Sequence, residues 1–164
     1  MKKETKKQLL IGAALVLELL FLLLYLNGRI DRLLDSDMSS EMILGQLLAR
    51  NNGILSDQWY YSTELRVLNT QLIYALFFRL SSNWHFVRMA STLVLWCVLI
   101  ASYGVLCRVM GCKKSFGVTA LLLAAPVSES YFRFVLAGVY YVPHLAIAFA
   151  ALALNEVYFK AQPD

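Results

Sequence analysis

Two aspartates separated by a single residue, Asp35 and Asp37, are the side chains in this sequence with the clearest potential for chemistry. Both carboxylates of such a pair, when it lies in a loop, can reach one divalent cation or one acceptor hydroxyl, as metal ligands or as a general base. The structural alternative is that Asp37 caps the helix that follows, while the loop is solvated in the ordinary way together with Arg32. Which role applies depends on the segments that surround the pair.

The composition is typical of a membrane protein. Hydrophobic residues make up 59% of the chain and charged residues 16%, against roughly 25% charged residues in soluble domains. The net charge is +4, with four lysines ahead of the first apolar run, where cytoplasmic lysines are expected. We expect no nucleic-acid binding, because no basic stripe with interleaved aromatic residues occurs. The three cysteines lie in or beside apolar segments, which favours a packing role over a disulfide.

The apolar pattern predicts an all-α fold: a polytopic transmembrane bundle of about four spans in one membrane domain, residues 1–164. The predicted spans are residues 9–27, 85–107, 116–133 and 139–158. Residues 1–8, 108–115 and 159–164 then lie in the cytoplasm, which places every lysine on that side. We expect the first span to remain as an anchor, because no small-residue cleavage site follows it. In a five-span alternative, residues 67–80 also cross the membrane.

Residues 28–84 are expected to form the first extracytoplasmic loop, since acidic and arginine side chains nearly balance there and lysine is absent. A helix capped by Ser39 or Ser40 and continuing through Arg50 would lie on the membrane surface. Residues 64–80 carry too many polar side chains for an ordinary span and predict a second interfacial or partly sunken helix. The loop thus contains one or two juxtamembrane helices.

Further polar side chains interrupt the last two spans near the same side of the membrane. Glu129 and Arg133 follow Pro126, and His144 follows Pro143. Glu129 and Arg133 either form a helical ion pair or present a carboxylate and a phosphate-binding guanidinium to a wet cavity. His144 either binds substrate or donates to a carbonyl that the proline leaves unpaired. The outer-leaflet arginines Arg66 and Arg88 either anchor the protein to headgroups in general or bind one specific phospholipid head.

The order of these elements resembles the amino-terminal part of the GT-C superfamily, polytopic glycosyltransferases that use polyprenyl-phosphate sugars. The resemblance is carried by a lysine-rich start, a first span and the acidic pair at Asp35 and Asp37. It continues with the helical stretch of residues 38–48, Trp59-Tyr60-Tyr61, an interfacial helix, and residues 83–88 at the start of the next span. The acidic pair is the one family motif that maps directly.

The resemblance implies transfer of a sugar from a polyprenyl-phosphate carrier to an extracytoplasmic acceptor, at a bacterial cytoplasmic membrane. Asp35 or Asp37 would act as the base or hold a divalent metal ion, and Glu129 would be the second acid. Arg66, Arg88 and Arg133 would bind the carrier phosphate. The family's lysine- and proline-containing stretch is absent, and its further spans are missing, so we expect an amino-terminal piece.

Two other functional classes remain open. The chain could be a non-catalytic membrane subunit that assembles with further membrane subunits, in which case its buried polar residues would join helices. It could also be part of a small lipid or solute transporter, although it lacks matching pairs of interrupted helices.

Overall fold

The computed structural model describes residues 2–61 and 69–162, and within these ranges the regular structure is entirely helical. This confirms the predicted all-α class. The elements are α1 (Lys2–Asn27), α2 (Ser36–Asn51), α3 (Thr70–Phe78), α4 (Trp84–Val109), α5 (Lys113–Ala124), α6 (Glu129–Tyr131), a π-helical segment η1 (Phe132–Ala137) and α7 (Val142–Ala161).

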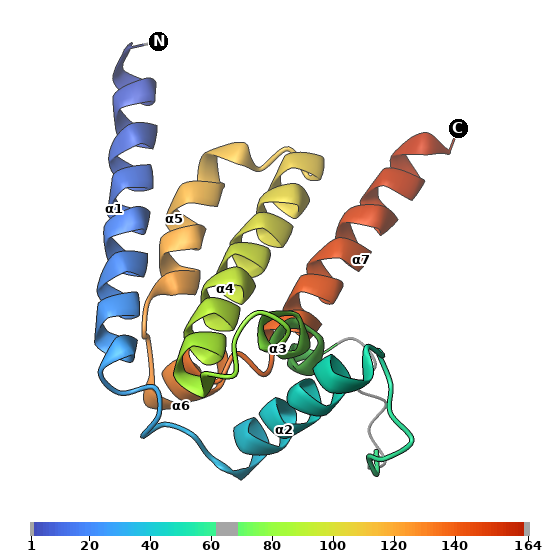
Figure 1. Ribbon diagram of the computed structural model, residues 1–164. Helices are drawn as coiled ribbons and strands as arrows, with labels where there is room; N and C mark the ends of the chain where they lie inside the picture. The colour runs from blue at the N-terminus through green and yellow to red at the C-terminus, as the bar shows by residue number, and fades with distance from the viewer. Residues whose placement is uncertain (1, 62–68, 163–164) are drawn as a thin grey trace.

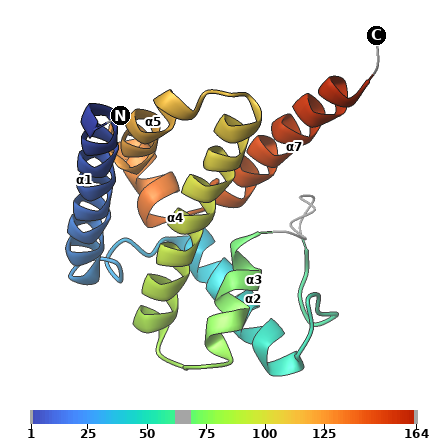
Figure 2. The ribbon, with the colours of Figure 1, turned by 90° about the horizontal axis from the view of Figure 1, so that it is seen from above.

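Helices α1, α4, α5 and α7 run between the two ends of the bundle. Helices α2 and α3 lie across one of these ends, the loop end (Figure 1). The opposite end, the terminal end, holds the start of α1, the junction of α4 with α5, and the end of α7, so both termini lie there. Seen from above, α1 lies beside α5, and α4 packs against α7 (Figure 2).

Among the residues that the structure describes, three helices are long and apolar enough to cross a membrane: Thr5–Asn27, Trp84–Val109 and Val142–Ala161. Such helices are those of an integral membrane protein. Asn83 begins the second of them, since its side-chain oxygen accepts a 3.1 Å hydrogen bond from Phe86 N. The third starts later than residue 139, because Val139 adopts a positive φ of 53° and Pro143 lies in the first helical turn.

The segment predicted as one span over residues 116–133 is divided into two helices. The helices Lys114–Ala124 and Glu129–Ala137 meet at an angle of 89°. Together they are long and apolar enough to form a fourth, broken span or a re-entrant loop. Pro126 explains the break, because a proline disfavours helical backbone in the residue before it, and Ala125 is indeed extended at ψ 136°. Ser128 then starts the next helix by accepting a 3.1 Å hydrogen bond from Tyr131 N.

Trp96 of α4 lies at the centre of the apolar core. It is buried with Leu22 and Leu26 of α1 and with Leu136 of η1. Its indole Nε1 donates a 2.9 Å hydrogen bond to Leu136 O, so a buried donor is satisfied within the core. This contact fixes the broken helix pair against the two straight helices.

The loop between the first two spans is built on a close crossing of α2 and α3. A Cβ atom added at Gly45 would lie 2.7 Å from Tyr74 Cβ and 3.0 Å from Gln71 O, so a side chain there would force the helices apart. The first predicted helix is present, but the predicted caps Ser39, Ser40 and Asp37 are wrong. Asp35 is the cap, so the helix starts at Ser36. Of the second predicted helix, residues 64–80, residues 64–68 lie outside the described residues, and α3 forms over Thr70–Phe78.

Candidate functional site

Asp35 is the centre of the candidate site, at the point where the connection from α1 becomes α2. Its Oδ1 accepts a 2.9 Å hydrogen bond from Met38 N, which makes it the N-cap of α2. The same oxygen accepts a 2.6 Å hydrogen bond from the phenol of Tyr140. Tyr140 belongs to the turn between η1 and α7, so the carboxylate joins two distant parts of the chain.

The backbone of that turn is shaped to bring Tyr140 to Asp35. Val139 has a φ of 53°, a conformation that a β-branched residue rarely adopts. Gly138 precedes it, and a Cβ atom there would come within 2.8 Å of Met38 Cε and 2.6 Å of Arg133 O. A side chain at residue 138 would therefore clash with the backbone of η1 and displace the end of the Met38 side chain of α2.

The hydrogen bonds decide whether Asp35 or Tyr140 carries the proton. Burial alone raises the pKa of Asp35, but the N–H of Met38, the phenol of Tyr140, the N–H of Asp37 and the charge of Arg88 together bring it below its ordinary value. The pKa of Tyr140 is raised, first by burial and then by its bond to Asp35. At neutral pH the pair is thus a carboxylate that accepts from a neutral phenol.

Arg88 extends this site into the interior. The side chain is 1% exposed, and its guanidinium donates to Ile30 O and, at 3.5 Å, to Leu33 O. It also contacts the sulfur of Met38. Because a buried cation is costly unless hydrogen-bonded, these contacts tie α4 to the connection between α1 and α2. Arg88 thereby positions the residue that caps α2.

The remaining expected site residues do not join this cluster. Asp37 is exposed on the first turn of α2, and Glu129, Arg133 and His144 are exposed on later helices. The ring of His144 lies 6.5 Å from the ring of Tyr141. Arg66 lies outside the described residues. Of the expected set, the structure brings Asp35 and Arg88 together.

Tyr140 was not expected at the site. A partial signal is present in the sequence, because residues 140–144 interrupt the last predicted span with polar and aromatic side chains. No local pattern indicates that residue 140 would contact residue 35. Such a contact follows from helix packing across more than half of the chain.

A further carboxylate, that of Glu41, is buried at the start of α3. It is 5% exposed and accepts from Asn69 Nδ2 at 3.1 Å, Thr70 Oγ1 at 2.5 Å and Gln71 N at 3.2 Å. The cap residue of α3, Asn69, makes no side-chain hydrogen bond to the helix N-terminus. Glu41 therefore caps α3 from the neighbouring helix, where a carboxylate also complements the helix dipole.

Asp35 and Asp37 were also expected to hold a divalent metal ion. In the described ranges, no three side chains of histidine, cysteine, aspartate or glutamate gather as a metal site. Magnesium is often held by one or two carboxylates together with substrate phosphates, so a metal ion here stays a prediction. The contacts that orient Asp35 are made by protein groups and do not depend on a metal ion.

Comparison of this chain with protein-family models, with curated proteins and with solved structures yields no match.

Proposed function

We propose that this protein transfers a sugar from a polyprenyl-phosphate carrier to an acceptor hydroxyl at the loop end of the bundle. The observation that carries the proposal is the hydrogen bond from Tyr140 to Asp35. It holds an ionised, half-buried carboxylate in a fixed orientation beside a membrane-spanning bundle. The order of a span, two short helices and a second span also supports the proposal, because it agrees with the GT-C resemblance.

Asp35 acts as the base in this proposal. It accepts the proton of the acceptor hydroxyl while the acceptor oxygen bonds to the anomeric carbon. The bond between that carbon and the carrier phosphate oxygen breaks, and the phosphate leaves with the bonding electrons. The lowered pKa makes this carboxylate a weaker base than an ordinary aspartate, and its negative charge also stabilises the positive charge that develops on the sugar.

The other residues take supporting roles. Tyr140 orients the carboxylate, and Arg88 positions it through the backbone carbonyls of residues 30 and 33. Because the guanidinium of Arg88 is buried, we assign the carrier phosphate to Arg133, which is exposed on η1. His144, exposed near the start of α7, is a second substrate contact.

The test compares Asp35→Asn with Asp37→Asn in the full-length protein. Membranes containing each variant are supplied with radiolabelled polyprenyl-phosphate sugars, and the label released from the carrier into acceptor is measured. Asp35→Asn is expected to lower the rate by roughly a hundredfold or more, as loss of a catalytic acid or base does. Asp37→Asn removes an equal charge two residues away and is expected to have a much smaller effect.

Equal rates for Asp35→Asn and the unchanged protein would contradict the role of Asp35. Absence of any carrier-dependent transfer by the unchanged protein would remove the enzyme proposal and favour the membrane-subunit alternative.

A further inference from the structure

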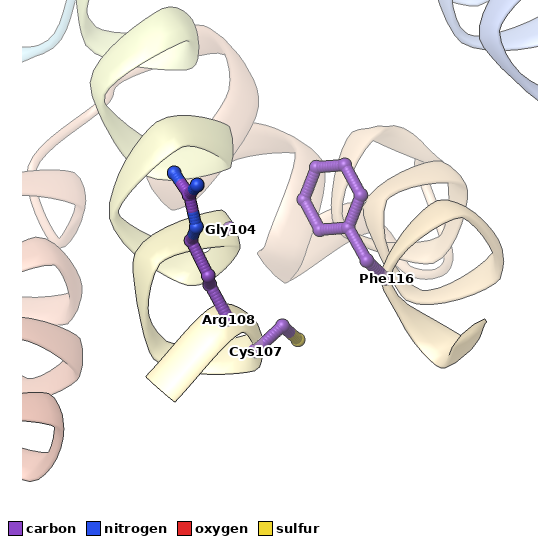
Figure 3. A pocket seen from close by; sticks show the side chains of 4 residues that line it. All are labelled: Gly104, Cys107, Arg108 and Phe116. Atoms are coloured by element: carbon purple, nitrogen blue, oxygen red, sulfur yellow. The ribbon is translucent and has the colours of Figure 1, made fainter. Parts of the chain in front are cut away.

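A pocket of about 320 Å³ lies at the terminal end of the bundle, far from the Asp35 site. It is formed where α4 ends and α5 begins, and it is lined by Gly104, Cys107, Arg108 and Phe116 (Figure 3). Its volume is at the lower end of the roughly 300–1,000 Å³ that small-molecule sites occupy. The proposed function assigns it no role.

Gly104 allows the ring of Phe116 to pack directly against α4. A Cβ atom at this position would lie 3.2 Å from Phe116 Cε2, so even a methyl group would press on the ring. Arg108 follows one helical turn later, and its side chain runs back along α4 past Gly104 (Figure 3). The ring of Phe116 forms the facing wall and stacks on Tyr103, with 6.1 Å between the ring centres.

The walls combine apolar surface with one exposed cation. Cys107 is buried and Phe116 is half-buried, whereas Arg108 is exposed. Among the described residues, no carboxylate pairs with Arg108; the ion pair at this end joins Lys160 to Glu156 at 3.1 Å. Lys160 also donates to Val109 O at 2.7 Å, so this ion pair of α7 lies beside the end of α4.

The whole terminal end is basic. Besides Arg108, the helix ends that meet there carry Lys6 and Lys7 on α1, Lys114 on α5 and Lys160 on α7. Arg108 lies in the last turn of a membrane-spanning helix, near the level of lipid headgroups, and its side chain runs back from there toward Gly104 (Figure 3). Basic pockets between membrane helices at such a position suit anionic headgroups.

We propose that this pocket binds one anionic phospholipid, with the phosphate paired to Arg108 and an acyl chain lying against Phe116. The charge of Arg108 selects an anionic over a zwitterionic lipid. The apolar walls select a lipid over a soluble phosphate. The inference depends on the membrane setting of the helices and is independent of the proposed sugar transfer.

Native mass spectrometry of the full-length protein in detergent tests this inference. Phosphatidylglycerol is titrated, and the apparent Kd of the first bound lipid is measured, with phosphatidylcholine as the zwitterionic comparison. One basic residue near a membrane surface contributes about 1 kcal/mol, which corresponds to roughly fivefold in affinity. Arg108→Ala is therefore expected to weaken phosphatidylglycerol binding about fivefold. The matched control is Arg50→Ala, which removes the same charge from α2 at the loop end.

A second variant and a competitor distinguish binding of the whole lipid from binding of its phosphate group alone. Gly104→Val keeps the charge of Arg108 but occupies the pocket, and we expect it to weaken lipid binding as well. Glycerol 3-phosphate in excess is expected to leave the bound lipid in place. Equal affinities for Arg108→Ala and the unchanged protein would overturn the proposal. So would equal loss in Arg50→Ala, or displacement of the lipid by glycerol 3-phosphate.

Discussion

The phenol of Tyr140 donates a 2.6 Å hydrogen bond to the carboxylate of Asp35, although 105 residues separate them in sequence. Asp35 also caps α2, so one carboxylate both starts the first helix of the loop and holds the turn before the last helix. The orientation of the candidate base, Asp35, therefore depends on how the whole bundle is folded.

Tyr140→Phe removes the hydrogen bond and retains the ring. Hydrogen bonds to charged groups contribute about 1.5–3 kcal/mol when buried, and the half-exposed position of Asp35 reduces this to about 1 kcal/mol. We expect a decrease in unfolding free energy of that size, measured by thermal unfolding in detergent. Tyr141→Phe is the matched control, since Tyr141 is exposed; an equal loss in both variants would show that the bond to Asp35 is not the cause.

Acid is expected to destabilise the loop end through Asp35. The pKa of Asp35 is lowered in the folded protein, so its contribution to stability is fully present above the unfolded-state pKa of about 3.9. That contribution is lost as the pH falls through the lower folded-state pKa. Thermal unfolding followed from about pH 6 down to about pH 3 should therefore show a decline near and below pH 4. Asp35→Asn should flatten this part of the profile, and an unchanged profile would contradict the assignment.

Glu41→Gln is expected to destabilise α3 specifically. The buried carboxylate accepts from Asn69, Thr70 and the backbone of Gln71, and an amide cannot accept from all three. Leaving buried donors unsatisfied costs about 1–3 kcal/mol. Hydrogen exchange should accelerate at the start of α3, while Asp57→Asn, at an exposed position of the same loop, should change little. Normal protection of α3 in Glu41→Gln would be inconsistent with capping by Glu41.

Gly45→Ala and Gly12→Ala form a matched pair that tests the crossing of α2 and α3. An added Cβ at Gly45 meets Tyr74 Cβ at 2.7 Å, whereas at Gly12 no heavy atom lies within 4 Å. Overpacking typically costs about 1–3 kcal/mol, while alanine in place of an unhindered helical glycine stabilises by up to about 1 kcal/mol. Thermal unfolding should thus move in opposite directions in the two variants.

The basic terminal end and the loop end are expected to face opposite sides of the membrane. Single cysteines at Asp57 and at Lys114, in a protein whose own cysteines are replaced by alanine, can be labelled with an impermeant maleimide. The charge distribution predicts labelling at residue 57 from outside the cell and at residue 114 after the membrane is opened. Labelling of both from the same side would contradict four crossings.

Local features of the sequence were enough to predict most of the helices. Apolar runs of sufficient length predicted the first, second and last spans, since the hydrophobic requirement of a membrane helix is visible along the chain itself. Pro126 marked the place where the third predicted span breaks, although the 89° angle between its halves was not expected. The second half of that span is joined to α4 by the hydrogen bond from Trp96 Nε1 to Leu136 O, a contact that no local pattern encodes.

The candidate site, too, could be predicted from the sequence only in part. The sequence by itself determined that an acidic pair follows the first span and that polar residues interrupt the last one, because both depend on neighbouring residues. Only the tertiary structure decided that Asp35 meets Tyr140, that Arg88 binds the backbone before α2, and that Glu41 caps α3. These contacts arise where helices distant in sequence pack closely, and a residue's partner there is set by the arrangement of the whole bundle.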